Sequence, residues 1–249
     1  MKLDNEDKCP AWSIRANKIE HIKSKKTIYY ENAVLKIFDF PVFYFPKFFH
    51  PDPTVKRQSG FLNPLIIDST NLGSGIVVPY FFNIGPDKDF TFTPKLYVEE
   101  HPLIQAEYRQ DFKNSFLILD SSYTEGYKKS DTKKEPGSKN HFFLKFTKDI
   151  VKSEDKNSNI ELNLQKVSNG TFLKVYDINS ELIDSDMNTL ESSLKYYYED
   201  EKSTIGFTAG RFVNLSITDN SRFEYLFPAL TFSKNLISSE DYGNTNFVS

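Results

Sequence analysis

Hydrophobic and polar residues alternate along most of the chain after residue 74. Such a period of two is typical of β-strands that are apolar on one face and polar on the other. The clearest run is DFTFTPKLYV, which puts Phe90, Phe92, Pro94, Leu96 and Val98 opposite Asp89, Thr91, Thr93, Lys95 and Tyr97. Three other runs repeat the pattern, LIQAEYRQ with Ile104, Ala106 and Tyr108, HFFLKFTK with Phe142, Leu144 and Phe146, and NIELNLQ with Ile160, Leu162 and Leu164.

Further strands are expected in SFLILDSSY, FLKVYDI, LESSLKYYYE, TIGFTAGRF and FEYLFPALTF. The segments between them differ in length. NIGPDKD and EEHP are short polar turns, whereas EGYKKSDTKKEPGSKN and INSELIDSDMNTL are longer hydrophilic loops. The second part of the chain is therefore predicted to be a series of antiparallel strands joined by unequal connections.

The first 64 residues follow a different pattern. WSIRANKIEH and KSKKTIYYENAVLKI are short β-like runs between charged turns, and they suggest stacked rungs of a β-solenoid or jellyroll. The next stretch, FPVFYFPKFFHPDPTVKRQSGFLNP, contains five prolines and seven aromatic residues. Because proline cannot donate to a β-ladder, it interrupts strand pairing. Pro41, Pro51 and Pro53 have a simpler alternative role, which is to stiffen an interdomain turn.

Composition supports an all-β protein. Aromatic residues make up 15% of the 249 residues, with 23 Phe and 14 Tyr, and aromatic side chains favour strands over helices. The net charge is −3, without a basic face, so nucleic acid is not an expected partner. No apolar run reaches the roughly 18 residues of a membrane-spanning helix, and no signal peptide is visible.

Two architectures explain the alternation. In a soluble sandwich, the apolar face packs on a second sheet. In an outer-membrane barrel, it faces lipid, with short turns at one end and long loops at the other. Tyrosines near strand ends, namely Tyr80, Tyr97, Tyr123 and Tyr196 to Tyr198, resemble an interfacial girdle and favour the barrel.

Seven motifs occur in an order and spacing that resemble one known family. They are WSIRA (12–16), NAVLKI (32–37), PVFYFP (41–46), KRQSGFLNP (56–64), VPYFFNI (78–84), DFTFTP (89–94) and AEYR (106–109). The chain resembles the lipopolysaccharide-assembly protein family, LptD, also called OstA. The resemblance is close from residue 9 to about residue 120 and looser beyond.

This resemblance implies a non-enzymatic role in moving lipopolysaccharide to the outer leaflet of the Gram-negative outer membrane. It implies the last rungs of a periplasmic β-jellyroll in residues 1–50, a connecting segment in residues 51–60, and the first antiparallel strands of a large, incomplete transmembrane β-barrel in residues 61–249. The implied partners are lipopolysaccharide, outer-membrane lipid, a plug lipoprotein of the LptE kind inside the barrel, and a periplasmic jellyroll bridge protein of the LptA kind.

The resemblance also assigns site residues. A lateral gate between first and last barrel strands would include Pro46, Pro64 and Pro79. Cys9 corresponds to a cysteine that in the family forms a disulfide with the far end of the barrel, so its partner would lie outside this chain. Acyl chains require a continuous apolar groove, and the candidates are Trp12, Ile14, Ile19, Ile28, Val34, Leu35, Ile37, Val42 and Tyr44.

Other chemistry is not indicated. The four histidines have no metal-ligand spacing, and there is no nucleophile elbow, phosphate-binding glycine loop or CxxC motif, so no cofactor, metal or catalytic residue is expected. Two alternatives remain. One is a small free-standing outer-membrane barrel acting as a porin, adhesin or enzyme, and the other is a soluble glycan-binding β-sandwich.

Overall fold

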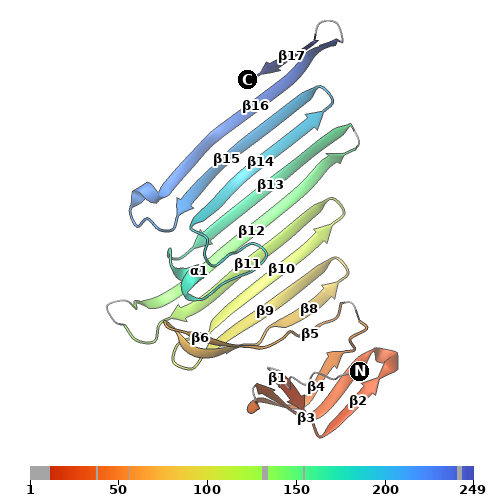
Figure 1. Ribbon diagram of the computed structural model, residues 1–249, viewed down its shortest axis with the longest axis vertical. Helices are drawn as coiled ribbons and strands as arrows, with labels where there is room; N and C mark the ends of the chain where they lie inside the picture. The colour runs from red at the N-terminus through yellow and green to blue at the C-terminus, as the bar shows by residue number, and fades with distance from the viewer. Residues whose placement is uncertain (1–11, 38, 56, 131–133, 154, 240–242) are drawn as a thin grey trace, which may run out of the picture.

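The computed structural model describes residues 12–37, 39–55, 57–130, 134–153, 155–239 and 243–249 (Figure 1). Two antiparallel sheets follow each other along the chain, the first with four strands and the second with thirteen. The helical segments are short: α1 (Phe172–Val175) and the 3-10 turns η1 (Lys23–Lys25) and η2 (Asn220–Arg222). In the described part of the chain, no helix has the length and apolar character needed to cross a membrane. The prediction of an all-β protein is confirmed.

The first sheet consists of three passes of the chain. Strands β1 (Trp12–Arg15) and β2 (Lys18–Ile22) lie end to end along one edge of β3 (Thr27–Ile37), and β4 (Phe40–Pro51) pairs with the other edge. In the second half of β3, every other residue is buried, namely Ala33, Leu35 and Ile37. This alternation is that of a strand with one covered face.

The pairing of β3 with β4 is disturbed halfway along, where Asn32 has a positive φ of 52° and the register places Pro46 opposite it. Residues three apart in a regular strand point to opposite faces. Beside this disturbance, the rings of Phe45 and Phe48 are nevertheless 5.3 Å apart and line the same cavity. Pro46 and Asn32 thus mark the point where β4 turns over, which keeps aromatic residues from both of its halves on one side.

The second sheet is an open meander in which each long strand pairs with the next (Figure 1). The order runs from the last strand back to β9 without a crossover, and β6 and β17 are its ends. The described strands do not close into a barrel. They are β5 (Gly60–Phe61), β6 (Leu65–Ser69), β7 (Gly73–Val77), β8 (Tyr80–Gly85), β9 (Lys88–Tyr97), β10 (Leu103–Phe112), β11 (Ser115–Gly126), β12 (Pro136–Lys152), β13 (Lys156–Val167), β14 (Thr189–Asp200), β15 (Ser203–Asn214), β16 (Phe223–Ser239) and β17 (Gly243–Val248).

The first hairpin of this sheet is broken in the middle of both of its arms. One arm consists of β5 and β6 and the other of β7 and β8, and β7 and β8 share the edge of β9. Pro64 lies between β5 and β6, and Pro79 lies between β7 and β8. One cross-arm hydrogen bond survives here, from Leu62 N to Pro79 O at 2.9 Å. The missing proline donors explain why four short strands replace two long ones.

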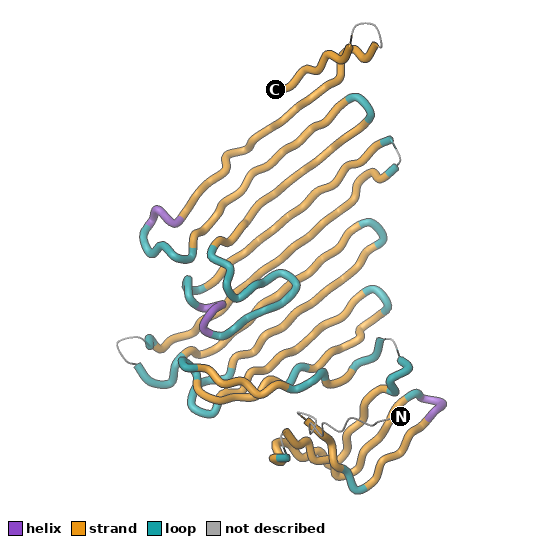
Figure 2. The backbone as a smooth tube through the Cα atoms, viewed as in Figure 1, coloured by secondary structure: helices purple, strands orange, loops and turns teal. Residues whose placement is uncertain are grey.

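The two ends of the second sheet carry different connections (Figure 2). At one end, β8–β9, β10–β11 and β14–β15 are joined by two-residue turns at 86–87, 113–114 and 201–202. At the other end, the connections include residues 168–188 and residues 215–222. The chain enters from the first sheet at the short-turn end, where Arg57 Nη1 donates to Pro86 O at 2.6 Å.

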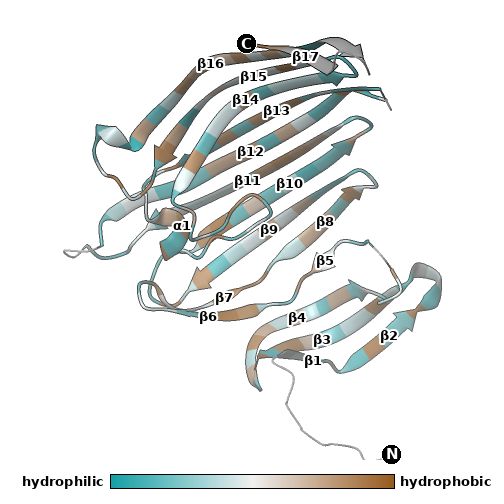
Figure 3. Ribbon diagram, turned by 45° about the horizontal axis from the view of Figure 1, so that its top comes forward, coloured by the Kyte–Doolittle hydropathy of each residue, from teal (hydrophilic) through white to brown (hydrophobic). Residues whose placement is uncertain are grey.

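The antiparallel register keeps like faces together from strand to strand, and hydrophobic and hydrophilic residues alternate along the ribbons (Figure 3). We call the face that carries Thr91, Thr93 and Lys95 the inner face. The opposite face, which we call the outer face, carries Phe92 and its cross-strand partner Ala106. The apolar side chains of the outer face are partly or largely exposed. Its exposed members include Phe82, Leu96, Phe142, Leu164 and Leu194. The alternation expected for the four clearest runs is confirmed.

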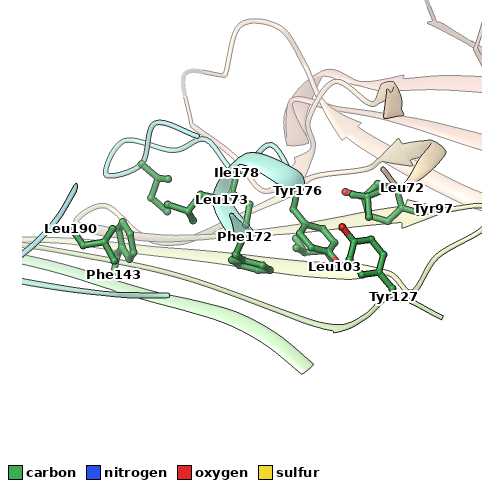
Figure 4. Close-up of a cluster of buried hydrophobic side chains, with 11 residues drawn as sticks. Leu72, Tyr97, Leu103, Tyr127, Phe143, Phe172, Leu173, Tyr176, Ile178 and Leu190 are labelled. Atoms are coloured by element: carbon green, nitrogen blue, oxygen red, sulfur yellow. The ribbon is translucent and has the colours of Figure 1, made fainter. Parts of the chain in front are cut away.

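The 168–188 connection, which we call the inner cover, folds back across the inner face (Figures 1 and 2). Phe172, Leu173 and Tyr176 are each 1% exposed. They pack with strand residues in one hydrophobic cluster, shown in Figure 4. The strand and turn members of that cluster are Leu72, Tyr97, Leu103, Tyr127, Phe143 and Leu190. This cluster is a core of the second sheet, and it covers only the long-connection end.

Polar contacts hold the inner cover in place. Lys95 Nζ donates to the carbonyl oxygens of Tyr176 and Asp177, at 2.9 and 2.6 Å, just beyond the end of α1. A lysine at that point satisfies carbonyls that a helix end leaves without partners. The guanidinium of Arg109 lies 3.7 Å from the carboxylate of Glu181.

The prediction that FLKVYDI forms a strand is wrong, because its first four residues are α1 and the rest belong to the inner cover. Phe172, Leu173 and Tyr176 lie at positions i, i+1 and i+4, so they share one side of a helical turn. Lys174 lies between them and is exposed. This spacing was the available signal, but four residues are too few for periodicity to decide between helix and strand.

The inner cover gives a first test. We expect Phe172→Ala to cost about 3–5 kcal/mol, because a fully buried ring would leave a cavity. Leu164→Ala, on the exposed outer face, should cost about 1 kcal/mol or less. Denaturant midpoints and hydrogen exchange of residues 172–178 measure both. Equal costs for the two variants would contradict the packing described above.

Candidate functional site

An apolar cavity of about 200 Å³ lies where the two sheets meet. The first sheet contributes side chains of β1, β3 and β4, and the second contributes the broken hairpin around Pro64. The cavity is open to the surface, so it is a recess between the sheets. Its lining residues are Ile14, Leu35, Phe45, Phe48, His50, Phe61, Leu62, Asn63, Pro64 and Val78.

Aromatic rings continue from this cavity onto the second sheet. Phe48 and Phe61 are 5.7 Å apart between ring centroids, and Phe61 contacts Tyr80 edge-on at 4.9 Å. Tyr80 is followed by Phe82 at 4.5 Å and then by Phe90 at 5.7 Å. Each spacing lies within the range of direct ring contact. The result is a continuous aromatic path from the first sheet to the outer face of the second.

One end of this path is held by a polar contact. Tyr30 packs against Phe48 at 5.6 Å, and its hydroxyl is hydrogen-bonded to His50 Nε2 at 2.8 Å. Burial raises the pKa of the Tyr30 hydroxyl. The hydrogen bond fixes the His50 ring at the wall of the cavity.

The predicted groove residues do not all share one surface. Ile14 and Leu35 line the cavity, and Ile37 is buried on the same side of β3 as Leu35. Val34 and Ile28 are partly buried, while Ile19, Val42 and Tyr44 are exposed. The backbone of Trp12 begins β1, and Cys9 lies outside the described residues. A lipid-binding role for any of them stays a prediction.

Sequence reasoning missed Phe45, Phe48, Phe61 and Val78 as cavity residues. Strict alternation would have assigned Phe45 and Phe48 to opposite faces, and only the turnover at Pro46 brings them together. The FPKFF motif holds a usable signal, since a proline inside an aromatic strand marks a break in the period.

The three predicted gate prolines lie at different places. Pro64 lines the cavity, and Pro79 follows Val78, which also lines it. Pro46 lies within β4, opposite Asn32, in the first sheet. Pro64 and Pro79 therefore interrupt the same hairpin, whereas Pro46 interrupts a different pairing.

Charged contacts fix the connection between the sheets. Arg57 Nη2 lies 2.5 Å from Asp89 Oδ2, and Arg109 Nε lies 2.9 Å from the other oxygen of the same carboxylate. Asp52 Oδ2 contacts His21 Nε2 at 2.5 Å. The pKa of Asp52 is lowered by hydrogen bonds from Thr54 and by the adjacent His21. The connection is thus anchored to both sheets.

The uncovered part of the inner face carries a ladder of alternating charges. Lys145 and Lys195 approach the carboxylate of Glu161 at 3.7 and 3.5 Å, and Lys195 also contacts Glu191 at 2.6 Å. All four residues remain partly exposed. The face that the ladder forms is hydrophilic and partly exposed.

A hydrogen-bonded network of four polar side chains is buried under the inner cover. Asp120 Oδ1 is 2.8 Å from His141 Nε2, and His141 Nδ1 is 2.6 Å from Ser122 Oγ. Gln105 Nε2 also donates to Asp120, at 3.3 Å. The side chains of Asp120 and His141 are fully buried, and Phe172 lies against the imidazole. Although the residue types are those of a hydrolytic triad, substrate cannot reach them, so their role is to satisfy polar groups in a packed interior.

No described group of three or more His, Cys, Asp or Glu side chains is placed to hold a metal ion.

Comparison with known proteins gives several relatives, although no family model matches the chain. The chain is similar to LPS-assembly protein LptD of Pseudomonas aeruginosa (strain UCBPP-PA14), with 32% identity over 113 residues, which are 45% of this chain and 12% of that protein. The LptD proteins of Idiomarina loihiensis and of Francisella tularensis subsp. novicida are 36% and 42% identical over 106 and 79 residues. These matches cover 43% and 32% of this chain and 14% and 9% of the relatives. The resemblance to LptD is confirmed, for a segment that spans a small part of each relative.

The Asp120–His141 pair can be tested by a double-mutant cycle. We expect Asp120→Ala to cost about 1–3 kcal/mol, because it leaves Gln105 and His141 buried without their acceptor. The same substitution in a His141→Ala background should cost less, with a coupling of at least about 0.5 kcal/mol. Asp149→Ala, which breaks an exposed pair with Lys152, serves as the control and should stay within about 0.5 kcal/mol. Additive costs at Asp120 and His141 would show that the two side chains do not interact.

Proposed function

We propose that this LptD-related chain takes part in moving lipopolysaccharide into the outer leaflet of the Gram-negative outer membrane, without making or breaking a covalent bond. The observation that carries the proposal is the aromatic path from the cavity between the sheets to the outer face of the second sheet. In this proposal the first sheet is the end of a periplasmic jellyroll, and the second is the beginning of a transmembrane barrel.

Three features support a membrane role for the second sheet. Strands such as β10, β11, β13 and β14 have 10 to 12 residues, which matches the 9 to 11 that a tilted transmembrane strand requires. The outer face is apolar and uncovered by other described residues. Short turns at one end and long connections at the other are typical of outer-membrane barrels, where the short turns are periplasmic.

The orientation of the second sheet in the membrane that follows from these features agrees with transport from the periplasm to the outer leaflet. The first sheet joins at the short-turn end, which would be periplasmic. An acyl chain leaving the cavity would meet Phe61, Tyr80 and Phe82 before it reached the lipid-facing side of β9. Each 40 Å² of apolar surface kept from water along this path is worth about 1 kcal/mol. The aromatic path therefore lowers the cost of moving acyl chains between two apolar environments.

The broken first hairpin would form the first-strand side of the lateral gate between the first and last barrel strands. Pro64 and Pro79 remove ladder donors from these first strands, so the seam that they form would be held by fewer hydrogen bonds than one between regular strands. Pro46 has a different part in this proposal, because it orients the aromatic residues of β4 towards the cavity. The saccharide of the same lipopolysaccharide molecule would move along the hydrophilic inner face.

The partners follow from the same arrangement. Lipopolysaccharide is the cargo, and outer-membrane lipid surrounds the outer face. A plug lipoprotein of the LptE kind would face the charged ladder inside the completed barrel. A bridge protein of the LptA kind would add to the jellyroll by strand pairing, as exposed sheet edges allow. Cys9 would pair with a cysteine outside this chain.

The cargo path can be tested by photocrosslinking in the full-length protein. A benzoylphenylalanine at Phe48 or Phe61 should capture lipopolysaccharide, because both rings lie on the proposed path. The matched control is Lys47, which neighbours Phe48 in β4 and is exposed. Lipopolysaccharide adducts detected by immunoblotting at Lys47 but at neither phenylalanine would refute the path.

The membrane orientation of the strands can be tested on β9. Phe92→Arg on the outer face should cost about 2–4 kcal/mol if the residue lies near the bilayer midplane, whereas Thr93→Arg on the inner face should cost much less. Folding of the full-length protein into lipid vesicles, followed by heat-modifiable migration on a gel, measures both. A larger effect at Thr93 than at Phe92 would reverse the assignment of the faces.

A further inference from the structure

A second cavity, of about 510 Å³, lies at the long-connection end of the second sheet, away from the aromatic path. Its lining includes three cationic residues from three elements, Lys166 of β13, Arg211 of β15 and Arg222 of η2. Among the described residues that line it, none is an aspartate or a glutamate. The chain as a whole is acidic, with a net charge of −3, so this local excess of positive charge requires an explanation.

The three cations are available to a ligand. Within the described part of the chain, none of them forms an ion pair, in contrast to Arg57, Arg109 and Lys195. The guanidinium groups of Arg211 and Arg222 instead approach the ring of Phe223, at 5.8 and 4.5 Å from its centroid. Stacking on a ring orients a guanidinium while leaving its N–H donors free.

The nearby carboxylates are directed elsewhere. Asp219 accepts hydrogen bonds from the backbone N and the hydroxyl of Ser221, at 2.8 and 2.5 Å. Glu191 pairs with Lys195 on the inner face. Glu224 pairs in register with Phe212, whereas Arg211 pairs with Tyr225, so Glu224 and Arg211 lie on opposite faces.

Strand register places Lys166 and Arg211 next to residues of the apolar outer face, while Leu190, which also lines the cavity, belongs to the cluster under the inner cover. Lys166 pairs with Phe142, which is 44% exposed, and Arg211 pairs with Tyr225, which is 63% exposed. The 168–171 and 215–218 segments complete the wall and contribute Asn169, Thr171 and Thr218. Cations and hydroxyl or amide groups thus meet where an apolar wall ends and polar connections begin.

We propose that this cavity binds the phosphorylated saccharide headgroup of a glycolipid in the outer leaflet. The assignment rests on the proposed membrane orientation, which puts the long connections at the outer surface. Guanidinium groups bind phosphate oxygens in a bidentate manner, and asparagine and threonine side chains suit sugar hydroxyls. Inorganic phosphate offers the same anionic chemistry without the lipid, and the experiment separates the two.

The test uses the full-length protein in phosphatidylcholine nanodiscs of three kinds. The first contain bisphosphorylated lipid A, and the second contain the same glycolipid without its phosphates. The third contain no glycolipid, and inorganic phosphate is added to the solution. Native mass spectrometry counts the bound molecules. We expect Arg211→Gln/Arg222→Gln to weaken binding of the bisphosphorylated glycolipid by about tenfold or more. Lys174→Gln, an exposed cation of the inner cover that pairs with Asp186, is the matched control and should change it by less than about twofold.

The outcomes discriminate clearly. Weaker binding of the dephosphorylated glycolipid, together with competition by millimolar phosphate, supports the proposal. Equal binding of both glycolipids, or an equal loss in Lys174→Gln, overturns it. Tight binding of inorganic phosphate without glycolipid binding overturns the lipid assignment. Surface display of lipopolysaccharide in cells reports on transport separately, so a variant that loses binding but keeps display supports the site and leaves the transport proposal standing.

Discussion

Antiparallel backbone pairing in a fixed register is the constraint on which the rest of the structure depends. Because side chains alternate across each strand, the register of one pair determines the faces of the next. From β9 to β15, no crossover interrupts the pairing, so apolar residues recur on the outer face, while the inner face is hydrophilic only where the inner cover does not pack on it. A one-residue slip at any pair would place Phe92 or Leu162 among charged residues.

The inner cover shows how this open sheet gains a core. A single sheet buries little surface on its own, and the outer face remains uncovered by described residues. Eleven buried residues of the inner cover and the adjoining strands form the hydrophobic cluster at one end. Lys95 and the Asp120–His141 pair satisfy the polar groups that this packing encloses. The other end keeps its charged ladder, so one face contains both a packed part and a partly exposed polar part.

Local breaks in the ladder produce the two features most closely tied to function. Pro46, opposite Asn32, brings aromatic residues of β4 to one side, and Pro64 and Pro79 divide the first hairpin. The cavity between the sheets lies against both breaks. The proposed anion site has a different origin, since it lies where two connections meet, beyond the point at which the β13–β14 backbone pairing ends at Asn163 and Ser193.

The sequence alone determined the all-β class, the outer and inner faces of the clearest strands, and the resemblance to LptD, because each depends on local periodicity or on ordered motifs. Tertiary structure decided the rest. FLKVYDI became a helical turn because its apolar residues found a sheet to pack against, which four residues of pattern cannot predict. Phe45 and Phe48 share a face only because of the turnover at Pro46. The grouping of Lys166 with Arg211 and Arg222 joins elements separated by the inner cover and β14, so no local pattern contains it.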